Sequence, residues 1–264
     1  MSSTAINTET KEITYEYPLS ERIRTFLRLE FLLDQYRFGA AGDSPWHTRM
    51  AISALLDVKG LLSRSDVRSE LQKELDRMIA SLEALKERPE VDASVLEPLL
   101  DECKQVSQAL RAAPTGMPPS VRDNEFLATI EQRAGVWGGT CAFDLPAYHL
   151  WLETPVADRR VLLEHWHEAF HLIDEGTRLV LRLLRDSADP VTEKASAGSF
   201  QAMLDRNTPY RMLRIILPPG LRCYPEISGS KHYCNIRFMK QPEHGERAQQ
   251  VEDDVTFTLE RCLI

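Results

Sequence analysis

The sequence lacks most of the features that mark secreted, membrane-spanning or disulfide-stabilised proteins. It has five cysteines in 264 residues, an odd number with no C-x-x-C pair, so neither a disulfide framework nor a zinc ribbon fits. No apolar run is long enough for a transmembrane helix. The first twelve residues, MSSTAINTETKE, have no basic start followed by an apolar run. We therefore expect no secretory signal peptide and a cytoplasmic location with reduced thiols.

The composition is that of a soluble globular protein, with 43% hydrophobic and 27% charged residues. Its length suggests one large domain or two small ones. The chain has 32 basic and 40 acidic residues and a net charge of -8. This acidity argues against a general nucleic-acid binder, although a local basic face remains compatible with it. A nucleic-acid-binding module is therefore kept as an alternative.

Motifs for nucleophilic catalysis and for phosphate binding are also missing from the sequence. There is no G-x-S-x-G elbow for a Ser/His/Asp hydrolase. Gly138-Gly139 is too short for a phosphate-binding loop and lacks the following Lys-Ser/Thr. These absences leave an enzyme open, but no motif among them supports one.

One segment matches a catalytic motif, the H-E-x-x-H run from His167 to His171. On a helix this spacing places two imidazoles one turn apart, and the glutamate beside them, Glu168, could activate a zinc-bound water. The surrounding periodicity predicts one helix over about 156–186, with both histidines on its solvated side, away from an apolar stripe. We therefore expect no metal site, and keep a zinc-dependent hydrolase as an alternative.

Most of the chain shows helical periodicity. After an alternating strand over 12–18, a helix is predicted from Ser20, and Ser44-Pro45 begins another that ends near Gly60. Further helices are predicted from Ser65 to about 88, from Ser94 in a capping-box pattern to near Pro114, over 125–133, from 144 to 154, and over 156–186.

Strand patterns return near the end of the chain, over 211–217, 221–224, 233–239 and 255–262, with turns at 228–230 and 244–245. Residues 191–208 are predicted to be a loop with some ambiguous helix. A lone N-terminal strand cannot satisfy its own backbone hydrogen bonds, so it should pair with these later strands. The predicted fold class is α+β, with a helical domain over 20–190 and a small antiparallel β domain from 1–19 and 191–264.

Basic residues concentrate between positions 209 and 240, where Glu226 is the one acidic residue beside Arg211, Arg214, Arg222, Lys231, Arg237 and Lys240. Further arginines lie on the first predicted helix, at positions 22, 24, 28 and 37. Two interpretations remain open. The charges could form a solvated strand face that prevents edge pairing, or a cationic groove for an acidic peptide or a phosphate backbone.

Four segments carry a resemblance to a known family. They are residues 17–31 except 23, residues 70–77, the block that begins Phe143-Asp144-Leu145-Pro146 and runs to 152, and residues 224–231 with Ile236-Arg237-Phe238-Met239. In this order they resemble the bacterial ZapD family, the Z-ring-associated cell division proteins, over roughly residues 13 to 262. The resemblance implies a cytoplasmic adaptor that is recruited to the division site at midcell. It implies that the protein is not an enzyme and has no cofactor. It also implies a homodimer, held partly through its β domain, that binds the C-terminal tail of FtsZ and crosslinks FtsZ filaments.

The resemblance also implies a basic pocket for the FtsZ tail. Arg28, His149 and Arg237 match basic positions of the family's site, and Arg64 and Lys231 match further ones. Two residues depart from the pattern, because Glu125 and Tyr233 stand where family arginines are expected. Arg122 and His232 are candidate substitutes. The resemblance implies neither a membrane nor a nucleic acid as a partner.

Overall fold

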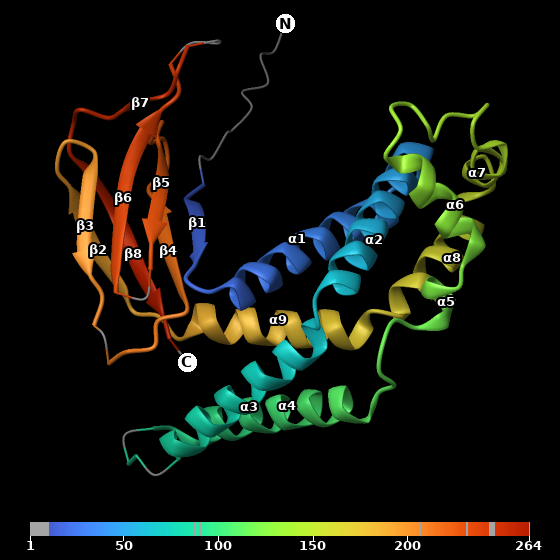
Figure 1. Ribbon diagram of the computed structural model, residues 1–264. Coiled ribbons are helices and arrows are strands. Elements are labelled where there is room, and N and C mark those ends of the chain that lie inside the picture. Colours follow the sequence, from blue (N-terminus) through green and yellow to red (C-terminus); the bar gives the residue numbers. More distant parts are fainter. Residues whose placement is uncertain are drawn as a thin grey trace, which may run out of the picture. The chain divides into compact units, whose positions relative to one another are not determined.

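The computed structural model describes residues 11–86, 88–89, 91–205, 207–230, 232–242 and 246–263. The chain divides into two compact units, and the boundaries fall inside the first and the last helix. The β unit comprises Met1–Arg24 and Arg182–Ile264, and the helical unit comprises Thr25–Leu181. Figure 1 shows the strands of the first unit and the helices of the second.

The β unit contains two antiparallel sheets. The first has the strand order β1-β4-β8-β2 and the second β3-β6-β5, with a short β7 paired to β6. The strands are β1 (Ile13–Pro18), β2 (Pro190–Ala195), β3 (Ser199–Met203), β4 (Met212–Leu217), β5 (Tyr224–Gly229), β6 (Tyr233–Lys240), β7 (Gln249–Gln250) and β8 (Val255–Cys262). The N-terminal β1 pairs with β4, Tyr15 opposite Ile215. The predicted α+β class, with the N-terminal strand joining the C-terminal ones, is confirmed.

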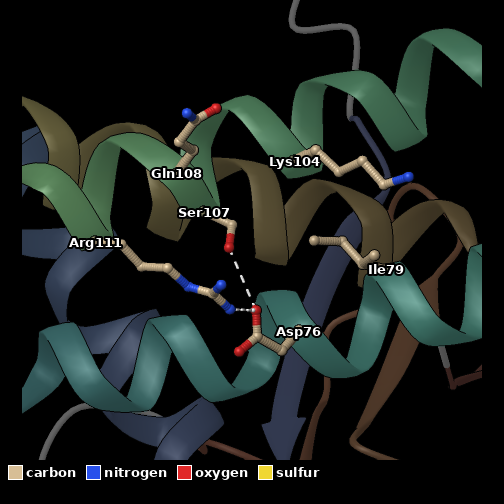
Figure 2. A pocket seen from close by; sticks show the side chains of 6 residues that line it. All are labelled: Asp76, Ile79, Lys104, Ser107, Gln108 and Arg111. Carbon is tan, nitrogen blue, oxygen red and sulfur yellow. Dashed lines mark hydrogen bonds and ion pairs between the residues drawn. The ribbon is translucent and has the colours of Figure 1, made fainter.

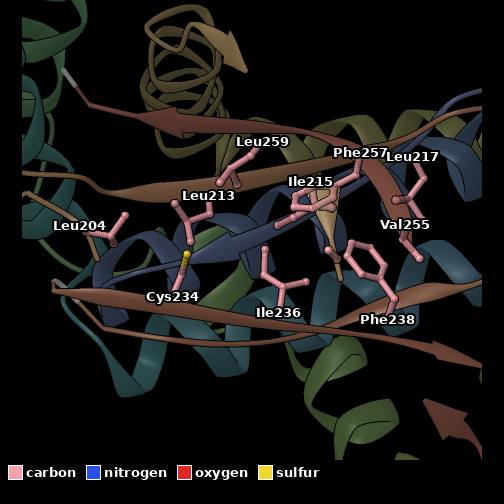
Figure 3. Packing of buried hydrophobic residues seen from close by; sticks show 11 residues of the cluster. Leu204, Leu213, Ile215, Leu217, Cys234, Ile236, Phe238, Val255, Phe257 and Leu259 are labelled. Carbon is pink, nitrogen blue, oxygen red and sulfur yellow. The ribbon is translucent and has the colours of Figure 1, made fainter. Parts of the chain in front are cut away.

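Alternate residues of β4, β6 and β8 fill the space between the two sheets. Because successive side chains of a strand point to opposite faces, one face of each strand is apolar and buried. Figure 3 shows these side chains pointing toward one another, and they are Leu213, Ile215, Leu217, Cys234, Ile236, Phe238, Val255, Phe257 and Leu259. The ring centroids of Phe238 and Phe257 are 5.0 Å apart. This sandwich core holds the strands in register.

The predicted loop over 191–208 is wrong, because β2 and β3 form there. A tight turn at Ala197-Gly198, with φ of 46° and 68°, carries the chain from one sheet to the other. The predicted strand over 221–224 is also misplaced, since β5 begins at Tyr224 and includes Pro225. Proline is tolerated there because β5 is an edge strand, where a missing N–H disrupts no ladder. The predicted turn at 244–245 lies outside the described residues.

The helices are α1 (Glu21–Ala41), α2 (Pro45–Arg64), α3 (Val67–Leu85), α4 (Ala93–Ala112), α5 (Pro119–Arg122), α6 (Glu125–Ala134), α7 (Pro146–Leu152), α8 (Val156–Glu168) and α9 (His171–Asp186). Ser44 caps α2 as predicted, its Oγ accepting from the N–H of His47 at 3.3 Å. The predicted cap of α4 at Ser94 is wrong. Asp92 is the N-cap, since its Oδ1 accepts from the N–H of Ser94 at 2.9 Å. Asp66 likewise caps α3, one residue after the predicted Ser65.

The predicted long helix over 156–186 is two helices, α8 and α9, separated by Ala169 and Phe170. Phe170 turns inward and is buried. Tyr36 Oη donates to the carbonyl of Leu163 at 2.5 Å, near the end of α8. Within α8, Leu163 is buried and the adjacent Leu162 is exposed. A periodic pattern continues through a one-turn interruption, so it did not indicate this break.

Candidate functional site

The H-E-x-x-H segment does not have the geometry of a helical zinc site. Its two histidines belong to different helices, because α8 ends at Glu168 and α9 begins at His171. The prediction that both lie on a solvated face is right for His171 and wrong for His167. His167 stacks on Tyr36 with ring centroids 5.1 Å apart, and its Nε2 lies 3.5 Å from Asp174 Oδ2.

Asp174 is the centre of an ion-pair network between α1 and α9. Its carboxylate pairs with Arg37 and, at 3.0 Å, with Arg178 Nε. Asp34 pairs with the same two arginines. In the part of the chain that the structure describes, no group of three or more His, Cys, Asp or Glu side chains could hold a metal ion. Asp174, the carboxylate beside His167, therefore links α1 to α9 through ion pairs.

A shallow pocket lies between α3 and α4, with a volume of about 380 Å³. Figure 2 shows its lining residues Asp76, Ile79, Lys104, Ser107, Gln108 and Arg111. Asp76 Oδ1 accepts from Arg111 at 2.7 Å and from Ser107 at 3.3 Å. Lys104 pairs with Glu83. The charged groups of this pocket thus neutralise each other, and their ion pairs connect α3 to α4.

Three of the predicted tail-binding residues lie in the helical unit, and all three are exposed. Arg28 lies on α1 and Arg64 is the last residue of α2, and neither has a carboxylate partner among the described residues. His149 lies on α7, with Nδ1 3.9 Å from Glu153 Oε1. Two arginines and a histidine are therefore accessible to an acidic ligand.

The other two predicted contacts belong to the β unit. Arg237 lies on β6 opposite Glu226 of β5 and pairs with it at 2.9 Å, with both side chains about half exposed. Lys231 lies outside the described residues. The proposed contacts therefore fall into two groups, one in each unit.

The basic stretch over 209–240 is less cationic in the fold than in the sequence. Arg214 pairs with Glu260 and, at 3.1 Å, with Glu16, which also accepts from Arg185 at 2.8 Å. Glu16 lies on β1 and Glu260 on β8, the two strands beside β4. Arg214 is therefore part of a neutral, mostly buried network within its own sheet and is not available to a ligand.

The outward surface of α7 has apolar side chains that sequence reasoning passed over. Pro146 and Ala147 lie one turn before Leu150, and all three are exposed, as is Phe143 in the preceding turn. The signal was present in the composition of α7, PAYHLWL, which is apolar on almost every side. A helix of that kind is normally buried all round.

The inward side of α7 is fixed by an aromatic cluster. Trp151 packs against Phe126 of α6 and Trp166 of α8, with ring centroids 5.5 and 5.8 Å apart. Arg49 of α2 lies over the ring of Tyr148 at 4.9 Å and donates to the carbonyl of Thr140 at 3.0 Å. Burial raises the pKa of Tyr148 to about 12, although Arg49 opposes this shift. The short helix is thus held on three sides.

A family model and individual relatives both assign the chain to the same family. A family model described as a cell division protein, ZapD, matches residues 27–237. The chain is also 40% identical over 253 residues to the cell division protein ZapD of Methylococcus capsulatus, covering 96% of this chain and 99% of the relative. This chain belongs to the ZapD family. It is 38% identical to the ZapD of Aromatoleum aromaticum and 35% to that of Chromobacterium violaceum, over 96% and 95% of its length and 98% and 99% of theirs.

ZapD membership gives the chain a role in cell division, and the predicted family is confirmed. The part matched by the ZapD model includes α7 and every predicted tail-binding residue. Glu125 and Tyr233, which stand where the family resemblance predicts arginines, are both exposed. The candidate substitutes are exposed as well, although Arg122 already pairs with Asp123 at 2.8 Å. None of the described helices has the length and apolar character needed to cross a bilayer.

Proposed function

We propose that this protein is a non-catalytic adaptor that binds the C-terminal tail of FtsZ. Acting as a homodimer, it crosslinks FtsZ filaments and promotes assembly of the Z-ring at midcell. Membership of the ZapD family over nearly the whole chain is the observation that carries this proposal. The exposed basic side chains Arg28, Arg64 and His149, together with Arg237 and Lys231, are the proposed contacts.

Arg28 and Arg64 are the most readily available of these contacts. Neither has a carboxylate partner among the described residues, so binding an acidic tail breaks no existing ion pair. Arg237 must exchange Glu226 for a carboxylate of the tail. An exposed pair contributes only about 0–1 kcal/mol, so this exchange has a small energetic cost. Charge-led binding of this kind is fast and weakens as salt is added.

Dimerisation would convert weak tail contacts into stable crosslinks. A dimer has two sites and a filament presents many tails, so the second contact forms at a high effective concentration. The resemblance assigns part of the dimer contact to the β unit. The edge strands of the first sheet are β1 and β2, and each has one backbone edge that pairs with no other described strand. A second copy of the chain could pair with such an edge.

Co-sedimentation with FtsZ polymer tests the proposal. The protein should pellet with polymers of full-length FtsZ and stay in the supernatant with polymers that lack the tail. Electron microscopy of the same samples should show bundles only when the tail is present. Equal pelleting with both polymers would contradict tail binding.

A further inference from the structure

We define the outward surface of α7 as Phe143, which precedes the helix, together with Pro146, Ala147 and Leu150. It is an apolar surface of the helical unit that no described residue covers. Phe143 is 85% exposed and Leu150 is 71% exposed. Single exposed apolar residues are common on protein surfaces. Here several lie close together, and His149 is the one polar residue on the exposed side of α7. Such a group indicates a binding surface. The family model includes this segment.

The support beneath this surface makes it a rigid platform. Leu145, Tyr148 and Leu152, from the opposite side of the same short segment, are buried. The aromatic cluster of α6, α7 and α8 and the contacts of Arg49 fix the helix from behind. A surface that is ordered before binding loses little conformational entropy when a ligand docks.

The size of the surface determines what can occupy it. A fully buried aromatic side chain covers about 150–250 Å², so one Phe, one Leu and two small residues amount to roughly 400 Å². A stable dimer buries about 800 Å² on each partner. The surface is therefore too small to hold a second folded copy by itself, and it fits a short segment with one or two bulky apolar side chains.

One basic side chain on this helix offers a contact to a carboxylate of such a segment. His149 is exposed on the same helix, one residue from Leu150. Its one carboxylate neighbour in the described chain is Glu153, at 3.9 Å and itself exposed. A ligand carboxylate can reach the imidazole while an adjacent apolar side chain covers Leu150.

We infer that the outward surface of α7 binds apolar side chains of the FtsZ tail, next to His149, one of the proposed basic contacts. This inference rests on the proposed function and adds a requirement to it. The tail must carry apolar as well as acidic residues, and part of its affinity must persist at high salt, because burial of apolar area is not screened.

Fluorescence anisotropy with a labelled synthetic peptide of the FtsZ C-terminal tail, at 0.05 and 0.5 M NaCl, tests the inference. The double variant Phe143→Ser, Leu150→Ser should bind the peptide at least roughly tenfold more weakly at both salt concentrations. The matched control is Val95→Ser, Val161→Ser, which removes exposed apolar side chains from α4 and α8. It should bind like the wild type.

A second peptide makes the test independent of how the variants fold. This peptide keeps every acidic residue of the tail and has serine in place of the bulky apolar ones. Wild-type protein should bind it at least roughly tenfold more weakly, and the remaining affinity should disappear at 0.5 M NaCl.

The outcomes separate this inference from the proposed function. If wild-type protein binds neither the tail peptide nor FtsZ polymer, both are overturned. If the tail peptide binds but neither the variant nor the serine peptide weakens binding, the inference on α7 is overturned and the proposed function stands. If the double variant changes the sedimentation mass of the protein and leaves peptide affinity unchanged, the surface mediates self-association instead, which also overturns the inference.

Discussion

Arg159 of α8 is a buried arginine that has no carboxylate partner among the described residues. It is 4% exposed, and it donates to Thr48 Oγ1 at 2.8 Å and to the carbonyl of Asp43 at 2.7 Å. The neighbouring Arg160 donates to the carbonyl of Ala41, at the C-terminal end of α1, where cations are favoured by the helix dipole. The two arginines fix the corner between α1 and α2.

Replacing Arg159 should therefore reduce stability without altering the exposed basic contacts. We expect Arg159→Met to lower the free energy of unfolding by about 1–3 kcal/mol, because it leaves buried oxygens without donors. Arg160→Met, at a more exposed position, should cost less. Urea unfolding followed by circular dichroism measures both variants. An Arg159 variant as stable as wild type would show that the buried charge contributes no net stabilisation.

Arg28 gives the complementary prediction, a change in binding without a change in stability. Arg28→Glu should weaken binding of the FtsZ tail roughly tenfold or more, since a hydrogen bond to a charged group contributes about 1.5–3 kcal/mol. Its melting temperature should stay near that of wild type, because the side chain is exposed. The matched control is Arg88→Glu, at another exposed arginine with no ion pair among the described residues. If both variants bind the tail peptide like wild type, the tail binds elsewhere.

For single residues, the sequence predicts exposure better than it predicts ion-pair partners. Arg28 could be placed on the outer side of α1 because its buried neighbours, Phe26 and Leu29, follow helical spacing. The neutralisation of Arg214 could not be predicted in the same way. Its partners Glu16 and Glu260 are distant in sequence, and only the strand order β1-β4-β8 brings them together.

Among the elements, the β2–β3 connection is the clearest failure of sequence-based prediction. Its turn uses Ala197 at a positive φ, where glycine or asparagine is usual, so no turn residue marks the first position. The hairpin also passes from one sheet to the other, which breaks the simple alternation expected of a single sheet. The helices α2, α3 and α4, in contrast, match their predicted ranges closely, because each carries many turns of periodic apolar residues. The same periodicity concealed the break between α8 and α9.

Two substitutions in this turn should therefore have opposite effects on stability. Ala197→Gly should stabilise the protein by up to about 1 kcal/mol, because glycine adopts a positive φ without a Cβ clash. Gly198→Ala should destabilise it, since a Cβ there would lie 2.3 Å from the carbonyl oxygen of Val251. Thermal unfolding of the two variants should shift in opposite directions. A shift in the same direction would contradict the assigned turn geometry.

The cap of α4 makes stability depend on pH. Hydrogen bonds from the hydroxyl and then the N–H of Ser94 lower the pKa of Asp92 below its ordinary 3.8. A lowered pKa stabilises the fold above the unfolded value and loses that contribution as the pH falls through the folded value. We expect Asp92→Ala to melt at a lower temperature than wild type at pH 7, with the difference shrinking as the pH falls below about 4. A difference of constant size down to pH 2 would indicate that the carboxylate charge is not involved.

For the whole molecule, the proposed crosslinking requires two tail sites per particle. We expect a homodimer at tens of micromolar, measured by sedimentation equilibrium. Dilution below the dimer dissociation constant should abolish bundling and leave binding of the tail peptide intact, because only bundling depends on two sites. A monomer mass at tens of micromolar would contradict crosslinking by a dimer.

The pairing of β1 with β4 has a consequence for how the protein is made. Residues 13–18 of β1 leave the ribosome long before residues 212–217 of β4, and at about 5–20 residues per second the delay is roughly 10–40 s. The helical unit, which lies between them in sequence, can fold during that interval, whereas the first sheet must wait for β8, the strand that joins β4 to β2. Synthesis therefore imposes an order in which the helices form first and the β unit closes only after β8 has been made.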